Sequence, residues 1–278
     1  MLLVTGANGQ LGNELRLILG DYAIYVDRDE LDITDESAVR TFFAGQEFEY
    51  VINCAAYTAV DKAEDDFEAA DRINRLGPAL LAKYGRRIIQ VSTDYVFDGT
   101  AHLPYKEDDV ANPTSVYGST KLAGEEAALA EAETAVVIRT AWLYSSFGAN
   151  FVKTMRRLGA ERDSLGVIFD QIGTPTYAAD LASAIVAMLP QIKAGTKEVY
   201  HYSNEGVASW YDFACAVMTE SGLPCAVRPL ETSEYPTRAT RPAYSVLNKS
   251  KIRRDFGLAL PHWRDGLKRC LRVLAEKR

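Results

Sequence analysis

The sequence predicts an α/β protein with a Rossmann-like, doubly wound parallel sheet and a smaller C-terminal α+β part. Two features of the first half of the chain carry this prediction. Short β-branched runs alternate with helical stretches, and a glycine-rich turn directly follows the first run. Strands that alternate with helices are joined by right-handed crossovers, so the sheet that they form is parallel.

The expected elements follow one another in the order that this fold requires. Thr34 is expected to open the second helix, and Gly85 is expected to end the third. Strands are expected at residues 2–4, 23–26, 50–52, 87–91, 135–138, 167–169 and 199–202. Helices are expected at residues 11–19, 35–43, 61–84, 115–131, 178–189, 209–221, 249–255 and 263–276.

Charge and composition exclude several classes of protein. The chain has 278 residues, and its 31 Lys and Arg against 38 Asp and Glu give a net charge of −7. Binding to nucleic acid through phosphate contacts needs an excess of basic residues, which this chain lacks. The longest apolar-leaning run, residues 181–189, is too short to span a membrane. The N-terminus shows no basic region before a long apolar stretch, so a signal peptide is not expected.

The cysteines indicate a reducing compartment. Cys54, Cys215, Cys225 and Cys270 stand far apart, and no Cys-x-x-Cys or Cys/His cluster occurs. This spacing argues against a zinc site or a disulfide framework. We therefore expect four reduced thiols in a cytoplasmic protein.

The glycine-rich turn predicts a dinucleotide site. Gly6, Gly9 and Gly12 lie between the first strand and the first helix, in a Gly-x-x-Gly-x-x-Gly spacing. Glycines at this place let the backbone approach a pyrophosphate, which the helix N-terminus then stabilises. We expect residues 1–143, together with about 166–202, to form the dinucleotide-binding domain. Residues 144–278 are expected to form most of the second part, across a soft boundary.

The second strand ends in residues that bear on the choice of cofactor. Asp27, or Asp32 just beyond it, can accept hydrogen bonds from an adenosine ribose. Each can equally be a solvated loop carboxylate or a helix cap. Arg28 can instead bind a 2′-phosphate, so the sequence leaves NADH against NADPH open.

A Tyr-x-x-x-Lys pattern predicts acid catalysis. Tyr117 and Lys121 are four residues apart on an expected helix, so they share one face. Thr93 lies at the end of the preceding strand, and strand ends of this kind point at the ligand crevice. A lysine ammonium beside a phenol lowers the pKa of the phenol, which suits a donor of a proton to a reduced carbonyl.

Longer motifs resemble one family, dTDP-4-dehydrorhamnose reductase, within the extended short-chain dehydrogenase/reductase superfamily. The similarity runs almost from end to end. The motifs that carry it lie at residues 53–64, 92–99, 116–125, 139–144, 150–155, 170–176, 210–212 and 241–242.

This resemblance implies hydride transfer from NADPH or NADH to the C4 ketone of dTDP-4-dehydro-L-rhamnose, giving dTDP-L-rhamnose. Tyr117 would donate the proton, Lys121 would lower its pKa and hold the nicotinamide ribose, and Thr93 would bind the C4 oxygen. The expected cofactor contacts are Gly6, Gly9, Gln10, Leu11, Gly12, Asp27, Arg28, Asp32, Ile33, Ala55, Ala56, Tyr57, Thr58, Val91, Tyr117 and Lys121. The expected substrate contacts are Val60, Thr93, Asp94, Tyr95, Trp142, Asn150 and Arg241.

Some of these residues also have structural interpretations. Trp142 would stack on the pyranose, or pack between domains. Tyr95 can belong to the core, and Asn150 can cap the next helix. Arg241 can contact a diphosphate or form a surface salt bridge.

Competing functions, both enzymatic and non-catalytic, remain among proteins that keep this fold. An epimerase, a dehydratase or another nucleotide-4-keto-sugar reductase would share the fold. A dehydratase would need a second acid after Asp94, where this chain has Tyr95. A non-catalytic NADP-binding regulatory subunit would be expected to lack Tyr117 or Lys121, and both are present.

Some members of the family dimerise through carboxylates that share Mg²⁺. Glu14 matches the first of these carboxylates, whereas Ala179 and a position near Val273 fall where the others stand. Glu276 lies one turn beyond Val273. Since a methyl group cannot coordinate Mg²⁺, we expect no bound metal and a monomer or a metal-independent homo-oligomer.

Overall fold

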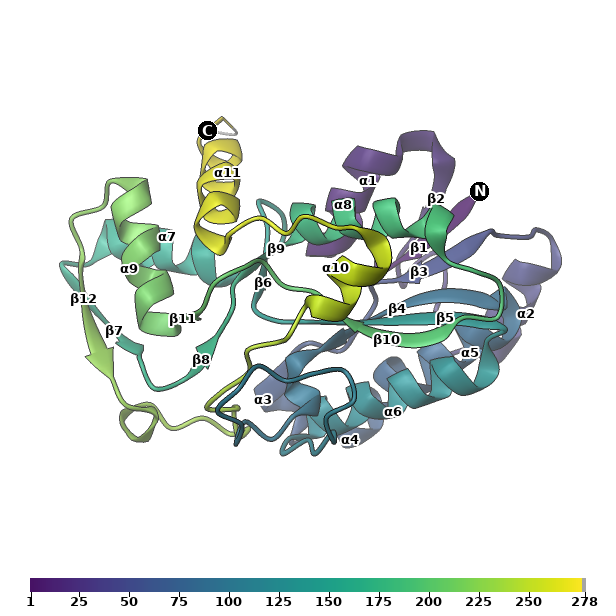
Figure 1. Ribbon diagram of the computed structural model, residues 1–278, viewed down its shortest axis with the longest axis horizontal. Coiled ribbons are helices and arrows are strands. Elements are labelled where there is room, and N and C mark those ends of the chain that lie inside the picture. Colours follow the sequence, from purple (N-terminus) through teal and green to yellow (C-terminus); the bar gives the residue numbers. More distant parts are fainter. Residues whose placement is uncertain (277–278) are drawn as a thin grey trace.

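The computed structural model describes residues 1–276 and confirms the predicted α/β fold class. Its centre is a six-stranded, wholly parallel sheet in which the first two strands along the chain lie at one edge (Figure 1). In spatial order the strands are β10 (Lys197–His201), β5 (Thr134–Thr140), β4 (Arg87–Thr93), β3 (Tyr50–Asn53), β1 (Leu2–Thr5) and β2 (Ala23–Val26).

Helices cover both faces of this sheet, as a doubly wound fold requires (Figure 1). One face packs on α1 (Gln10–Leu19) and α8 (Ala178–Met188). The other face packs on α2 (Glu36–Ala44), α5 (Gly77–Gly85) and α6 (Val116–Glu131). Successive side chains of β1 illustrate the two layers, because Leu2 and Val4 enter the first core and Leu3 the second.

A second, smaller unit lies beyond the carboxyl ends of the strands (Figure 1). Its core is lined by side chains of α7 (Phe151–Glu161), α9 (Trp210–Ser221) and α11 (Trp263–Glu276). Three two-stranded sheets complete it: β6 (Leu143–Tyr144) with β9 (Thr176–Tyr177), β7 (Ser164–Ile168) with β12 (Ala226–Leu230), and β8 (Ile172–Gly173) with β11 (Ala208–Ser209). The short helix α10 (Ser250–Phe256) returns to the first core.

The chain therefore crosses between the two units more than once. Of the stretch 166–202, α8 and β10 lie on the central sheet, whereas β7 pairs with β12 in the smaller unit. Pro229 stands within β12, a strand that the sequence does not predict. Proline is tolerated there because the strand has a single partner.

The expected helix at 61–84 is wrong in one respect, because it is interrupted after α3 (Val60–Ala63). The second piece runs without a break through α4 (Phe67–Asp71), a π-helical turn (Arg72–Leu76) and α5. Asp66 starts the second piece by accepting a hydrogen bond from the Ala69 amide. Asn74, on the π-helical turn, bonds the Tyr57 backbone and the Thr120 hydroxyl, which ties the irregular turn to α6.

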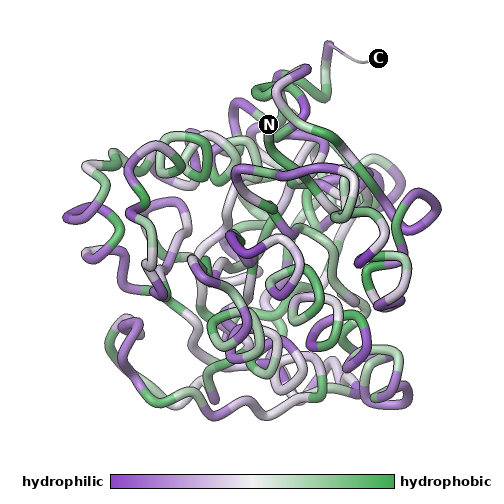
Figure 2. The backbone as a smooth tube through the Cα atoms, turned by 90° about the vertical axis from the view of Figure 1, so that its right-hand side faces the viewer, coloured by the Kyte–Doolittle hydropathy of each residue, from purple (hydrophilic) through white to green (hydrophobic). Residues whose placement is uncertain are grey.

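The start of α2 also differs from the prediction. Asp35, not Thr34, is the capping residue, because its carboxylate accepts the amides of Ser37 and Ala38. Along the outer helices the tube in Figure 2 alternates between hydrophilic and hydrophobic segments, as amphipathic helices do. None of the helices within residues 1–276 is both long and apolar enough to cross a membrane.

Candidate active site

A cavity of about 990 Å³ opens along the carboxyl ends of the central strands, at the junction of the two units. This is where ligands bind in open α/β sheets. Nineteen predicted site residues line it: Gly6, Gly9, Gln10, Leu11, Asp27, Arg28, Asp32, Ile33, Ala55, Ala56, Thr58, Val60, Val91, Thr93, Asp94, Tyr95, Tyr117, Lys121 and Trp142.

Gly6 and Gly12 show why the turn after β1 needs glycine. Gly6 has a φ of +65°, and a Cβ there would lie 2.5 Å from the Ala55 amide nitrogen. A Cβ on Gly12 would lie 2.6 Å from the Gly6 carbonyl oxygen, so α1 can start directly against the turn. Gly9 stands before α1 without a side-chain cap, and Gly9, Gln10 and Leu11 at the start of the helix line the cavity. These features fit a pyrophosphate and therefore a dinucleotide.

One end of the cavity is polar and partly exposed. Asp27 accepts the amides of Asn8 and Arg28, each on a different carboxylate oxygen. Asp32 instead bonds the Thr34 amide and hydroxyl, and these hydrogen bonds hold the pKa of Asp32 below its usual range. This end has the two carboxylates and the arginine that the sequence predicts beside an adenosine.

The sequence does not predict a second arginine at this end. Arg72, from the π-helical turn, lines the cavity and donates to the Thr34 hydroxyl at 3.0 Å. Together with Arg28 it lies close enough to Asp32 to lower the pKa of that carboxyl. The long helix expected at this place gives no signal that Arg72 would turn toward the cavity.

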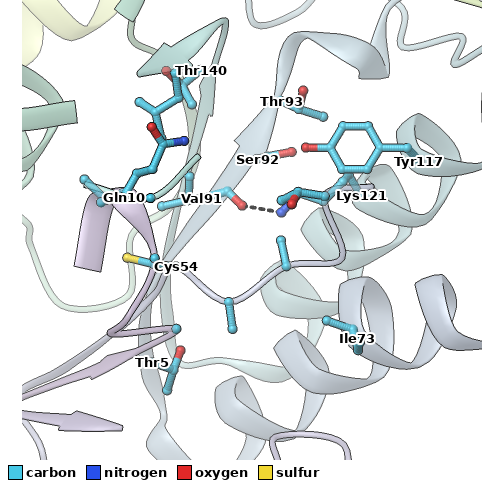
Figure 3. Close-up of a pocket in the computed structure, with 18 of the residues that line it drawn as sticks. Thr5, Gln10, Cys54, Ile73, Val91, Ser92, Thr93, Tyr117, Lys121 and Thr140 are labelled. Atoms are coloured by element: carbon cyan, nitrogen blue, oxygen red, sulfur yellow. Dashed lines mark hydrogen bonds between the residues drawn. The ribbon is translucent and has the colours of Figure 1, made fainter. Parts of the chain in front are cut away.

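The opposite end is buried and brings the predicted catalytic residues together. Figure 3 shows the Tyr117 hydroxyl directed toward Ser92 and Thr93 on β4, with Lys121 beside them. The Lys121 ammonium donates to the Val91 carbonyl at 2.6 Å. Ser115 caps α6 by accepting the Gly118 amide, which fixes the first turn of the helix that carries Tyr117.

Burial has the largest influence on the pKa values of Tyr117 and Lys121 at this end of the cavity. It raises the pKa of Tyr117 to about 12, although a hydrogen bond with Thr93 opposes the shift. It lowers the pKa of Lys121 to about 8, with Glu125 acting in the opposite direction. Tyr117 is therefore protonated at neutral pH, as a proton donor must be. In this structure burial, not the Lys121 charge, dominates the pKa of the phenol.

Asp94 follows Thr93 and is itself buried. Its carboxylate accepts a hydrogen bond from the Thr93 hydroxyl at 3.0 Å, and that hydroxyl also accepts the Tyr95 amide. Burial raises the pKa of Asp94 to about 6 despite hydrogen bonds from Ser245 and Thr93. The Tyr95 ring meets the Tyr117 ring edge-on at 5.4 Å. Thr93 is thus held in one orientation.

Trp142 enters the cavity wall from an unusual backbone conformation. Its φ is +47°, which is strained for a non-glycine residue and is often associated with functional sites. Its ring stacks on Trp210 of α9 with 3.6 Å between centroids. The sequence does not predict Trp210 as a lining residue. The stacked pair joins the two units at the cavity wall, so one face of Trp142 is already covered.

Four predicted residues lie outside the lining as far as the described residues define it: Gly12, Tyr57, Asn150 and Arg241. Asn150 caps α7 and donates to the Gln10 side chain at 3.0 Å. Arg241 forms a bidentate ion pair with Asp61. In this structure, therefore, Asn150 is a helix cap and Arg241 forms a salt bridge, as their structural interpretations state.

The carboxylate singled out for metal binding is buried. Glu14 accepts the Ser145 hydroxyl at 2.5 Å, and Asp180, next to Ala179, is paired with Arg269. Within residues 1–276 no group of three or more His, Cys, Asp or Glu side chains could hold a metal ion.

Comparison with known proteins gives consistent results. Residues 1–276 match the family described as "RmlD substrate binding domain". A dTDP-4-dehydrorhamnose reductase of Aggregatibacter actinomycetemcomitans is 41% identical, and the alignment covers 99% of each chain.

Solved structures are similar over the same extent. A crystal structure of a dTDP-4-dehydrorhamnose reductase from Clostridium acetobutylicum has a TM-score of 0.95 and 42% identity, covering 99% of both chains. A reductase of the same name from Bacillus anthracis, in complex with NADP, has a TM-score of 0.94 and 36% identity, covering 98% of both chains.

Proposed function

The chain belongs to the dTDP-4-dehydrorhamnose reductase family, and we propose that Tyr117, Lys121 and Thr93 carry out its reaction. The protein is an NAD(P)H-dependent oxidoreductase that reduces the C4 ketone of dTDP-4-dehydro-L-rhamnose to dTDP-L-rhamnose. One observation above all supports the assignment of residues. The three side chains meet at the buried end of a cavity whose other end begins at a glycine turn.

The chemistry divides between the cofactor and the chain. A bound NADPH or NADH supplies the hydride that reaches C4. Tyr117 gives its phenolic proton to the C4 oxygen, so the O–H bond of the phenol breaks as that of the alcohol forms. The Thr93 hydroxyl, which donates to Asp94 in this structure, would turn from that carboxylate to donate to the same oxygen. Lys121 adds a positive charge near the phenolate that this step leaves.

A bound cofactor would lie along the wall between Lys121 and Asp27, both of which line the cavity. Gly6, Gly9 and the start of α1 would hold its pyrophosphate, and Asp27, Arg28 and Asp32 its adenosine ribose. Its remaining contacts are assigned to Gln10, Leu11, Gly12, Ile33, Ala55, Ala56, Tyr57, Thr58 and Val91.

The nucleotide sugar occupies the side nearer the smaller unit. Val60, Asp94, Tyr95 and Trp142 line this side. Asn150 and Arg241 lie next to the lining, and Arg241 would have to leave Asp61 to reach a diphosphate. Trp142 can offer the sugar only the face that Trp210 leaves uncovered.

We also propose that the protein works in the cytoplasm, without nucleic-acid or membrane partners, as a monomer or a metal-independent homo-oligomer. The four cysteines are free thiols, which agrees with a reducing compartment. The carboxylates of Glu14 and Asp180 already have partners within the subunit.

The direct test is to incubate the protein with dTDP-4-dehydro-L-rhamnose and NADPH and to identify the product by NMR. The proposal expects stoichiometric oxidation of NADPH and formation of dTDP-L-rhamnose. No turnover, or a product with the other configuration at C4, would contradict the assigned reaction.

A further inference from the structure

The helix that carries Tyr117 and Lys121 has a third residue on the same face. Glu125 follows Lys121 by four positions, so the three side chains stack along one side of α6. They meet consecutive residues of β4. The Tyr117 hydroxyl is directed toward Thr93, Lys121 donates to the Val91 carbonyl, and Glu125 accepts the Ser92 hydroxyl.

A salt bridge fixes the outer side of Glu125. Arg139 stands opposite Ser92 in the register of β4 and β5, and its guanidinium donates to both Glu125 oxygens at 2.8–3.1 Å. Glu125 and Arg139 are only 2% and 5% exposed. The Arg139 guanidinium also lies 5.1 Å from the Phe97 ring centroid. A fixed bidentate geometry holds the carboxylate in one place.

We propose that Glu125 is a positioning residue that keeps Lys121 in its charged form, and this inference depends on the proposed catalytic function of Lys121. Lys121 is 3% exposed, and its hydrogen bond goes to a neutral carbonyl. A buried ammonium without a nearby anion loses its proton readily. Glu125 supplies that anion one turn away on the same helix.

Other charged or titratable groups around Lys121 do not replace this carboxylate. Burial raises the pKa of the Cys54 thiol to about 12, so it is neutral at physiological pH. Arg139 and Lys121 carry the same charge, and Glu125, not Asp94, is the carboxylate that raises the pKa of Lys121. The groups that face Lys121 from α6 and the adjoining elements are Tyr117, Glu125, Cys54, Asp94 and Arg139.

If the salt bridge between Glu125 and Arg139 had only a structural role, a different experimental result would be expected. Buried ion pairs often contribute little net stability, and replacing both partners by neutral groups can be tolerated. If Glu125 served only to join α6 to β5, its removal would lower the melting temperature but leave the titration of Lys121 unchanged. The titration therefore separates the two roles.

The experiment measures that titration directly, by NMR of protein labelled with ¹³C at the lysine ε-carbons, with K121M to assign the signal. In the wild type we expect a midpoint of about 8. In E125Q the midpoint should fall by about one unit, because Arg139 loses its counter-charge. In E125D, which keeps the charge, it should stay near the wild-type value. Lys249, the other buried lysine within residues 1–276, is an internal reference that should not move.

Two further variants complete the test. E14Q changes another buried glutamate that accepts a serine hydroxyl, and it should leave Lys121 unchanged. E125Q/R139Q removes both charges of the pair and should place the midpoint between those of E125Q and the wild type. If E125Q alone fails to fold, the double variant replaces it in the test. A Lys121 midpoint that is unchanged in E125Q, or in the double variant where that replaces E125Q, overturns the proposal. An E125D midpoint equal to that of E125Q also overturns it.

Activity provides a second readout. kcat/KM reports groups of the free enzyme, so its basic limb should follow Lys121 and move to lower pH in E125Q. A midpoint shift of one unit lowers kcat/KM about fivefold near pH 8. The NMR titration needs neither substrate nor cofactor. A wild type without reductase activity would contradict the proposed function, whereas an unmoved Lys121 signal would contradict the role of Glu125.

Discussion

The two ends of the cavity use similar charged groups in opposite surroundings. At the end proposed to be catalytic, Lys121 and Thr93 are 3% and 6% exposed, whereas Arg28, at the end proposed to hold the adenosine, is exposed. Burial moves the pKa of Lys121 to about 8, while Asp32 is shifted mainly by hydrogen bonds from Thr34. Removing a charged side chain should therefore change activity strongly at the buried end and only modestly at the exposed end.

The largest expected effect is that of Tyr117→Phe. It removes the proton donor, so kcat should fall by about 10²–10⁴-fold, while the dissociation constant for NADPH stays nearly the same. Stopped-flow or steady-state kinetics, together with fluorescence titration of NADPH, measure both quantities. Tyr105→Phe is the matched control, since Tyr105 is buried outside the cavity lining. Near-normal turnover of Tyr117→Phe would contradict the assignment of Tyr117 as the proton donor.

Lys121→Met should have a smaller effect on rate but should also weaken cofactor binding. It removes a charge and an expected contact to the ribose, and a charged hydrogen bond is worth about 1.5–3 kcal/mol. We expect kcat/KM to fall about 10- to 100-fold and the NADPH dissociation constant to rise. Lys249→Met removes another buried lysine, which bonds Ser203 away from the cavity. If both variants lose the same activity, the loss reflects folding and not the role of Lys121.

The sequence predicts the features of the site that depend on short stretches of chain, and misses those that depend on irregular or long-range geometry. The order of strands and helices follows from local apolar patterns, and the glycine turn and Tyr-x-x-x-Lys lie in short stretches. Arg72 and Trp210 reach the cavity through irregular or long-range geometry instead. Arg72 depends on a π-helical turn inside an expected continuous helix, and Trp210 depends on stacking against a residue 68 positions earlier. The partnership of Glu125 with Arg139 depends on the pairing of β4 with β5.

At the adenosine end we expect dual use of NADH and NADPH, with a kcat/KM ratio below about 100-fold, or 2.7 kcal/mol. Asp27 favours the ribose hydroxyls of NADH, while Arg28 and Arg72 attract a 2′-phosphate. Both effects act at a partly exposed rim. A larger ratio in either direction would show that one of them dominates.

Variants at this end sharpen the comparison with the catalytic end. Arg28→Gln and Arg72→Gln should each shift the preference toward NADH by a factor of about 2 to 5, since exposed charge pairs contribute about 0.2–1 kcal/mol. Arg75→Gln is the control, because Arg75 pairs with Asp71 and lies outside the described cavity lining. Changes of a hundredfold or more here would mean that the rim is as sensitive to charge as the buried end.

Removal of metal ions is expected to have no effect on the mass of the protein in solution or on its kcat. Mg²⁺ requires several oxygen ligands in octahedral geometry. The Glu14 carboxylate is 4% exposed and accepts the Ser145 hydroxyl, and Asp180 is held by Arg269. Ala179 contributes no oxygen from its side chain. Sedimentation velocity with and without EDTA should give the same mass, and kcat should not change. A dimer that dissociates on chelation would show that these carboxylates leave their partners to share a metal between subunits.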